Sequence, residues 1–247
     1  MAFDTATLDA PFAALAAYDW GADAGPFATI DKAVTAAHAD ATLRADLEKR
    51  LGAILGGGTS RAAKEYACRK LMMIGTAASV PALAALLGDK DNSHMARFAL
   101  ERIGGPEAGE VLRKALDDLA GDLKRGMISS LAGRRDTACV PALAKLLGAD
   151  ATLAAAAAEA LGTIGTPEAL AALAVADPTA PGGLGRAVVD ARLACAERLL
   201  AAGRRAEAQA AYESLAAAAR GKPAAKHVEL AATRGILACV DTTTAAK

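Results

Sequence analysis

A leucine recurs about every 30 residues in the middle of the chain, and this period constrains the fold more than any other feature of the sequence. The leucines are Leu71, Leu100, Leu131 and Leu161, and the residues four positions before them are Ala67, Ala96, Met127 and Ala157. Positions four apart lie on one face of an α-helix. The period therefore predicts one apolar helical stripe in each of four successive units.

The turns between the expected helices repeat as well. Residues 80–83 (VPAL) recur as residues 140–143, and residues 103–108 (IGGPEA) resemble residues 164–169 (IGTPEA). We expect each glycine to end a helix in a left-handed conformation, and each proline to open the first turn of the next helix. The repeating unit is thus a helical hairpin. One hairpin cannot bury its apolar face alone, so neighbouring hairpins must stack.

Composition agrees with a fold made of helices. Hydrophobic residues make up 53% of the chain but aromatic residues only 3%, and alanine, the best helix former, supplies much of the apolar content. We expect an all-α protein, a right-handed α-solenoid of stacked hairpins. The expected helix pairs are 60–74 with 79–88, 93–103 with 106–120, 122–133 with 138–148, and 151–163 with 167–176.

The ends of the chain depart from the repeat. Three further helical patterns, at about 8–18, 27–38 and 41–55, precede a run of three glycines, and a stretch rich in proline and glycine follows the last repeat. Terminal repeats need one polar outer face, so divergent caps are expected. We divide the chain into a helical cap (1–58), an array of about four hairpins (59–177), a loop (178–185), and a C-terminal hairpin with a closing helix stacked on the array (186–247).

The pattern A-x-x-x-L-x-x-I-G followed by V-P-A-L-x-x-L-L, at residues 67–75 and 80–87, resembles HEAT repeats. The similarity is to the short bacterial type that also occurs in phycobilisome lyases, and residues 199–212 resemble one tetratricopeptide hairpin. The resemblance implies a helical solenoid, since HEAT arrays serve mostly as protein-binding scaffolds and only occasionally as enzymes.

Charge and hydropathy disfavour some functions. Lys plus Arg and Asp plus Glu each number 28, so the chain lacks the positive excess expected for extended nucleic-acid binding. No window is long and apolar enough to predict a membrane span, and residues 1–4 do not begin a signal peptide. We expect a cytoplasmic protein, or a periplasmic or secreted one if a signal peptide has been removed.

The sequence shows no recognisable catalytic or metal-binding motif. The three histidines are isolated, and the cysteines are far apart in sequence, which favours small buried thiols over a zinc site. We therefore expect no cofactor, no metal and no catalytic residue, and the oligomeric state stays open.

An aromatic and acidic cluster interrupts the N-terminal cap. Tyr18, Asp19 and Trp20 are consecutive at an expected turn, and Trp20 is the only tryptophan. Trp20 would either plug the first layer of the stack or offer an aromatic platform to a ligand.

A second candidate surface follows the repeat. Positions six and two residues before each repeat leucine point away from the core stripe and share an exposed helix face. Basic residues gather on or beside this face, at Lys64, Arg69, His94, Arg97 and Arg125. They would either attract acidic groups of a partner or only keep the face solvated.

The third repeat differs from the others at its helix end. It carries Arg134 and Arg135 where the others carry Ile-Gly, and Gly133 comes earlier, so we expect this helix to end about a turn sooner. Two guanidinium groups at such an edge would grip a carboxylate or phosphate, although Asp136 could pair with one of them.

These patterns favour a non-enzymatic scaffold that binds a protein or peptide along the exposed helix ladder. Two alternatives stay open. One is a small-molecule or sugar-binding protein with its site near Tyr18 to Trp20. The other is a tetrapyrrole-handling protein like the phycobilin lyases, which only the family resemblance supports.

Overall fold

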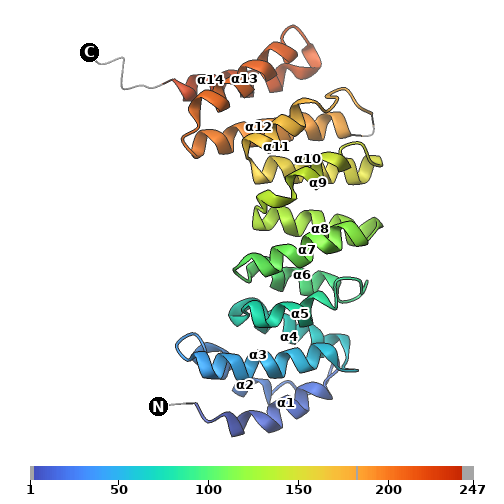
Figure 1. Cartoon of the computed structure of the whole chain (residues 1–247), viewed down its shortest axis with the longest axis vertical. Coiled ribbons are helices and arrows are strands. Elements are labelled where there is room, and N and C mark those ends of the chain that lie inside the picture. Colours follow the sequence, from blue (N-terminus) through green and yellow to red (C-terminus); the bar gives the residue numbers. More distant parts are fainter. Residues whose placement is uncertain (1–2, 182, 241–247) are drawn as a thin grey trace, which may run out of the picture. The chain divides into compact units, whose positions relative to one another are not determined.

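The computed structural model describes residues 3–181 and 183–240, and every regular element in these ranges is a helix (Figure 1). Contacts divide the chain into two units, one ending at Ser130 and one beginning at Leu131. The helices of the first unit are α1 (Asp9–Ala16), α2 (Phe27–Ala36), α3 (Ala41–Gly56), α4 (Arg61–Ile74), α5 (Val80–Ala84), α6 (Ser93–Arg102) and α7 (Pro106–Asp118). The boundary between the units falls within α8 (Gly121–Arg134).

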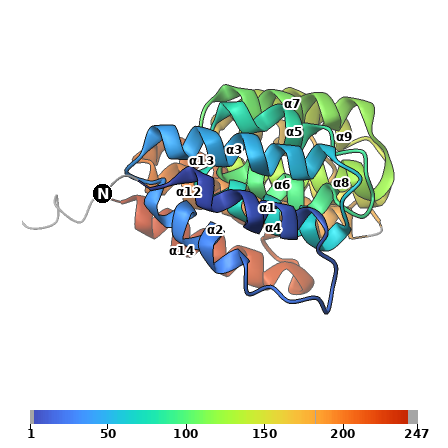
Figure 2. The same ribbon diagram turned by 90° about the horizontal axis from the view of Figure 1, so that it is seen from below.

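Helices of the first unit pack in two layers. Helices α1, α3, α5 and α7 contact one another in chain order, and α2, α4 and α6 do the same. Figure 2 shows α3, α5 and α7 on one side of this unit and α2 and α4 on the other. The layer of α2, α4 and α6 carries most of the candidate site described below.

The second unit continues the same construction. Its helices are α9 (Val140–Leu146), α10 (Ala151–Ile164), α11 (Pro167–Ala174), α12 (Leu184–Ala201), α13 (Arg205–Ala219) and α14 (Lys226–Cys239). Helices α10, α12 and α14 contact one another in order, and α9 contacts α11. The fold is thus the expected α-solenoid of helical hairpins, stacked within each unit.

The periodic leucines form the core, as the spacing predicts. Leu71, Leu100, Leu131 and Leu161 have no exposed surface, and neither do the four residues one turn before them. Each leucine removes a full side chain of apolar surface from water, a gain of about 1.5–3 kcal/mol. The repeat therefore sets both the helix faces and the core.

Caps and prolines begin the helices where the sequence indicates. Asp40, Ser60 and Asp150 accept hydrogen bonds from backbone N–H groups in the first turns of α3, α4 and α10. Prolines occupy the first turns of α5, α7, α9 and α11. These signals repeat with the hairpin and set where each helix begins.

Some helix ends differ from the expectation. Helix α5 stops at Ala84 instead of continuing to residue 88. After it the backbone forms the tighter hydrogen bonds of a 3-10 turn, from the Leu86 N–H to the Leu83 carbonyl and from the Leu87 N–H to the Ala84 carbonyl. The expected left-handed glycine occurs at Gly165 (φ 69°), but not at Gly104. There Ile103 ends α6 in an extended conformation, and Gly105 takes the positive φ of 85°.

Candidate functional site

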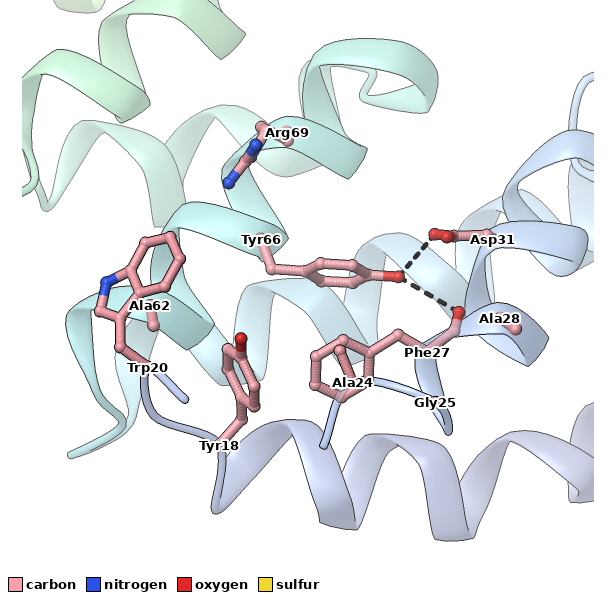
Figure 3. Close-up of a pocket in the computed structure, with 10 residues that line it drawn as sticks. All are labelled: Tyr18, Trp20, Ala24, Gly25, Phe27, Ala28, Asp31, Ala62, Tyr66 and Arg69. Atoms are coloured by element: carbon pink, nitrogen blue, oxygen red, sulfur yellow. Dashed lines mark hydrogen bonds between the residues drawn. The ribbon is translucent and has the colours of Figure 1, made fainter. Parts of the chain in front are cut away.

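A pocket of about 320 Å³ opens on the first unit, between the connection that joins α1 to α2 and the helices α2 and α4. Figure 3 shows the side chains around it. The residues that line it are Tyr18, Trp20, Ala24, Gly25, Phe27, Ala28, Asp31, Ala62, Tyr66 and Arg69. Four of the ten are aromatic in a chain that is only 3% aromatic, so the pocket concentrates a scarce residue type.

Aromatic packing fixes the base of the pocket. The Phe27 ring is 5% exposed and lies between Tyr18 and Tyr66, with ring centroids 4.9 Å apart in both pairs. The Tyr18 contact is edge to face, an arrangement that aromatic quadrupoles favour. In addition, the Ser60 hydroxyl donates to the Tyr18 carbonyl at 2.5 Å. The connection before α2 is thereby fastened to the start of α4.

A polar network fixes the hydroxyl end of the Tyr66 side chain. Its hydroxyl donates to Asp31 Oδ1 at 2.6 Å, and Lys70 Nζ lies 2.6 Å from the same oxygen. Partial burial opposes ionisation of Asp31, but hydrogen bonds from Lys70 and Tyr66 outweigh it and hold the pKa of Asp31 below its ordinary value. Burial, and then the bond to Asp31, raise the pKa of Tyr66. The Tyr66 ring is therefore a fixed and neutral wall.

Two polar groups point into the space between the walls. In Figure 3 the Tyr18 hydroxyl lies between Trp20 and Tyr66, and the Arg69 guanidinium lies on the opposite side of that space. One Arg69 nitrogen is 2.5 Å from Glu65 Oε1, while the Arg69 side chain stays 58% exposed. A guanidinium has five N–H donors, so Arg69 retains donors for a ligand.

The structure places the residues predicted at the cap in two environments. Tyr18 and Trp20 line the pocket, and Trp20 is 69% exposed, so it does not plug the core. Asp19 is absent from the lining, because its carboxylate accepts a hydrogen bond from the Trp20 backbone N–H at 2.8 Å. Asp19 thus shapes the turn that presents Trp20.

Seven of the ten lining residues were not predicted from the sequence, among them Phe27, Asp31 and Tyr66. Phe27 and Asp31 lie in the divergent cap, Tyr66 is not one of the repeated positions of α4, and the three meet only when α2 packs on α4. One signal was available. Tyr66 and Lys70 are one turn apart, and the Lys70 Nζ lies 4.7 Å from the Tyr66 ring centroid.

The predicted basic surface is divided among several local contacts. Arg69 belongs to the pocket, and Arg125 lies 3.0 Å from Asp122 on its own helix. The His94 ring packs against Phe98 in a tilted arrangement, with ring centroids 4.4 Å apart. Lys64 is half-buried. The pocket is therefore the place where one of these cations meets groups from other helices around an open space.

Arg97 has a structural position between α6 and α8. Its guanidinium donates to the Gly126 carbonyl at 2.9 Å and to the Ser130 hydroxyl at 3.0 Å. The Ser130 hydroxyl in turn donates to Glu101 at 2.7 Å. Burial lowers the pKa of Arg97. These bonds join adjacent helices of the first unit.

The expectation that the third repeat helix ends early is wrong. Helix α8 runs to Arg134, three residues past Leu131, just as α4 runs three residues past Leu71. Arg135 takes the left-handed conformation, with φ 52°. Its N–H bonds to the Ala132 carbonyl, and the Asp136 N–H bonds to the Leu131 carbonyl. This is a Schellman ending in which arginine replaces the usual glycine.

The two arginines that were predicted to bind an anion therefore differ in burial and in their place at the helix end. Arg134 is the last residue of α8 and is half-buried. Arg135 is exposed, and its backbone completes the turn after the helix. A contact with a ligand or partner remains a prediction for this pair.

Residues 3–181 and 183–240 offer little for other kinds of site. This part of the chain holds no group of three or more residues suited to a metal ion. All four cysteines are buried and free, and burial raises the pKa of Cys68 to about 12 and that of Cys195 to about 11. No helix among the described residues combines the length and hydropathy needed to cross a membrane.

The fold defines the protein as an α-solenoid of helical hairpins, and comparison with protein families gives the kind of repeat. The family described as HEAT repeats matches residues 109–187, and the PBS lyase HEAT-like repeat matches residues 94–118. The chain therefore contains HEAT repeats within residues 94–187. No curated protein matches the chain.

Proposed function

We propose that this protein is a scaffold that binds a peptide segment of a partner protein through the pocket at Trp20. One observation carries the proposal: Trp20 is 69% exposed at the edge of a pocket whose other aromatic residues are fixed by packing and hydrogen bonds. Exposed tryptophan and tyrosine are frequent centres of protein recognition, because they bury a large area with little loss of side-chain freedom.

HEAT repeats support the same function, since they commonly serve as protein-binding scaffolds. The pocket lies in the first unit, on the layer of α2 and α4, and its walls come from three separate segments. A site built on helices is better fixed than one on loops alone. A partner segment would therefore meet a surface that is already formed.

The size of the pocket disfavours the tetrapyrrole alternative. A volume of about 320 Å³ lies at the low end of the range of about 300–1,000 Å³ for small-molecule sites, so it would enclose only part of a large macrocycle. The match to the PBS lyase HEAT-like repeat covers residues 94–118, none of which lines the pocket. A short segment of polypeptide suits this volume better.

Selection from a displayed peptide library tests the proposal. Peptides enriched on the wild-type protein should bind it, and should lose at least about tenfold in affinity for Trp20→Ala, because a central aromatic anchor is removed. Phe98→Ala is the matched control: Phe98 is also an exposed aromatic of the first unit, 44% exposed, but lies outside the pocket. It should bind the same peptides as the wild type.

Two results would overturn the proposal. One is that no peptide is enriched, and the other is that enriched peptides bind Trp20→Ala as tightly as the wild type. Quenching of Trp20 emission by a soluble sugar, in the absence of peptide binding, would favour the small-molecule alternative instead.

A further inference from the structure

We infer that the pocket binds a proline-rich segment in the polyproline II conformation. This inference rests on the proposed function and names the chemistry of the partner. Its basis is the kind of group that each side of the pocket offers: apolar ring surface on the walls, and hydrogen-bond donors between them.

The walls select an apolar and rigid ligand. Trp20 on one side and Tyr66 on the other present ring surface to the space between them (Figure 3). Phe27 closes the base, where it is 5% exposed and packs against the rings of Tyr18 and Tyr66. Proline rings fit between aromatic ridges of this kind, and the polyproline II helix is already ordered before it binds.

The charges around the pocket disfavour a cationic ligand. An aromatic pocket with a free carboxylate would suit an ammonium group. Here, however, Asp31 Oδ1 already lies 2.6 Å from both the Tyr66 hydroxyl and Lys70 Nζ. The Arg69 guanidinium at the edge of the space is likewise paired, with Glu65. A lysine or methylated lysine side chain would therefore meet no unpaired acid.

The polar groups that face the space require acceptors. Arg69 offers donors only, and the Tyr18 hydroxyl has no hydrogen-bond partner among the described residues. A proline-rich segment supplies backbone carbonyls as acceptors and has no proline N–H to leave unpaired. A sugar instead brings many hydroxyl donors, and Oδ1 of the lining carboxylate, Asp31, already accepts from Tyr66 and Lys70.

The pocket should be formed before the ligand arrives. Ser60 fixes the Tyr18 backbone, Asp31 fixes Tyr66, and the Trp20 backbone N–H is held by Asp19. Binding of a preordered segment to a preformed pocket loses little conformational entropy. This match favours a proline-rich segment over a flexible one of similar hydropathy.

Fluorescence anisotropy of a labelled, end-blocked oligoproline tests the inference, with a Gly-Ser peptide of equal length as the reference ligand. We expect saturable binding of oligoproline and at least about tenfold weaker binding of the Gly-Ser peptide. Trp20→Ala should weaken oligoproline binding by at least about tenfold, because one apolar wall is removed. Phe98→Ala should bind it like the wild type.

Two conservative variants separate hydrogen bonding from the shape of the pocket. Tyr18→Phe keeps the ring against Phe27 and removes the hydroxyl, and Arg69→Met keeps the length of the side chain and removes the donors. Each should weaken oligoproline binding by about threefold to tenfold, the range of one hydrogen bond. Unchanged thermal unfolding of both variants would show that the loss is not a folding defect.

The outcomes distinguish the inference from the function on which it rests. If oligoproline binds no better than Gly-Ser while displayed peptides without proline bind in a Trp20-dependent manner, the inference fails and the proposed function stands. If neither oligoproline nor any displayed peptide binds, both fail. Equal oligoproline affinity in the wild type and Trp20→Ala would also overturn the inference.

Discussion

Arg135 and Gly165 occupy equivalent positions, four residues after a buried leucine, and both have a left-handed backbone, with φ 52° and 69°. Glycine adopts this conformation freely, whereas a residue with a Cβ is strained there. The third repeat thus keeps the backbone of a glycine ending with an arginine in it. The hydrogen bonds of the Schellman ending hold Arg135 in place.

Replacement of Arg135 by glycine should stabilise the protein. We expect Arg135→Gly to raise the free energy of unfolding by about 0.5–1 kcal/mol, because it removes the strain of a left-handed residue with a Cβ. Urea denaturation measures the change. Arg134→Gly is the control and should lower stability by up to about 1 kcal/mol, because Arg134 is still helical. Loss of stability in Arg135→Gly would contradict this description of the turn.

Close packing of α10 on α12 depends on Gly162. A Cβ added there would lie 2.8 Å from the Ala191 Cα and 2.9 Å from its carbonyl oxygen. Backbone atoms cannot rotate away, so Gly162→Ala should lower the free energy of unfolding by about 1–3 kcal/mol despite the better helix propensity of alanine. The measurement is thermal or chemical denaturation.

Gly148→Ala provides the control for that substitution in the same unit. The nearest atom to its added Cβ is the Lys145 carbonyl oxygen at 3.8 Å, an ordinary contact. Its stability should stay within about 0.5 kcal/mol of the wild type. Equal effects of the two substitutions would show that α10 and α12 do not approach so closely.

Two arginines of the predicted basic surface should behave differently. Arg97→Ala removes two hydrogen bonds between α6 and α8, so we expect a loss of about 1–2 kcal/mol in the free energy of unfolding. Arg125→Ala removes one exposed ion pair with Asp122 and should cost no more than about 0.5 kcal/mol. Denaturation curves of the two variants give the comparison, and an equal cost would contradict the structural position of Arg97.

The contribution of Asp31 to the stability of the protein, through its contact with Tyr66, should depend on pH. The pKa of Asp31 is lowered from 3.8 in the folded protein, so its contribution to stability is present above 3.8 and is lost as the pH falls through the folded pKa. We expect Asp31→Asn to melt below the wild type at neutral pH. The gap should shrink as the pH falls below 3.8, and a gap that is constant with pH would exclude this role for Asp31.

The repeat part of the fold could be predicted from the sequence because the same leucine spacing and turn residues occur in several successive units. Leu71, Leu100, Leu131 and Leu161 share one spacing, and that spacing alone fixes the buried face. The ends of the helices were harder to predict from the sequence. Arg135 shows why: tertiary packing and turn hydrogen bonds impose the left-handed conformation on a residue whose type predicts against it.

The candidate site was only partly predictable for a related reason. Tyr18 and Trp20 are conspicuous in a chain with few aromatic residues. Phe27 and Tyr66, however, reach the pocket through the packing of the divergent α2 on α4, and no repeat marks that contact. Arg69 was recognised as exposed, but its place beside the aromatic residues depends on the same packing.

Accessibility of Trp20 to a quencher is a direct test of peptide binding at the pocket, because Trp20 is the only tryptophan and its emission reports the pocket alone. Acrylamide should quench it strongly in the free protein, where the residue is 69% exposed. In a complex with a saturating enriched peptide, we expect a clearly smaller quenching constant and emission at shorter wavelength. Unchanged quenching and wavelength in a complex shown to be formed would contradict peptide binding at this pocket.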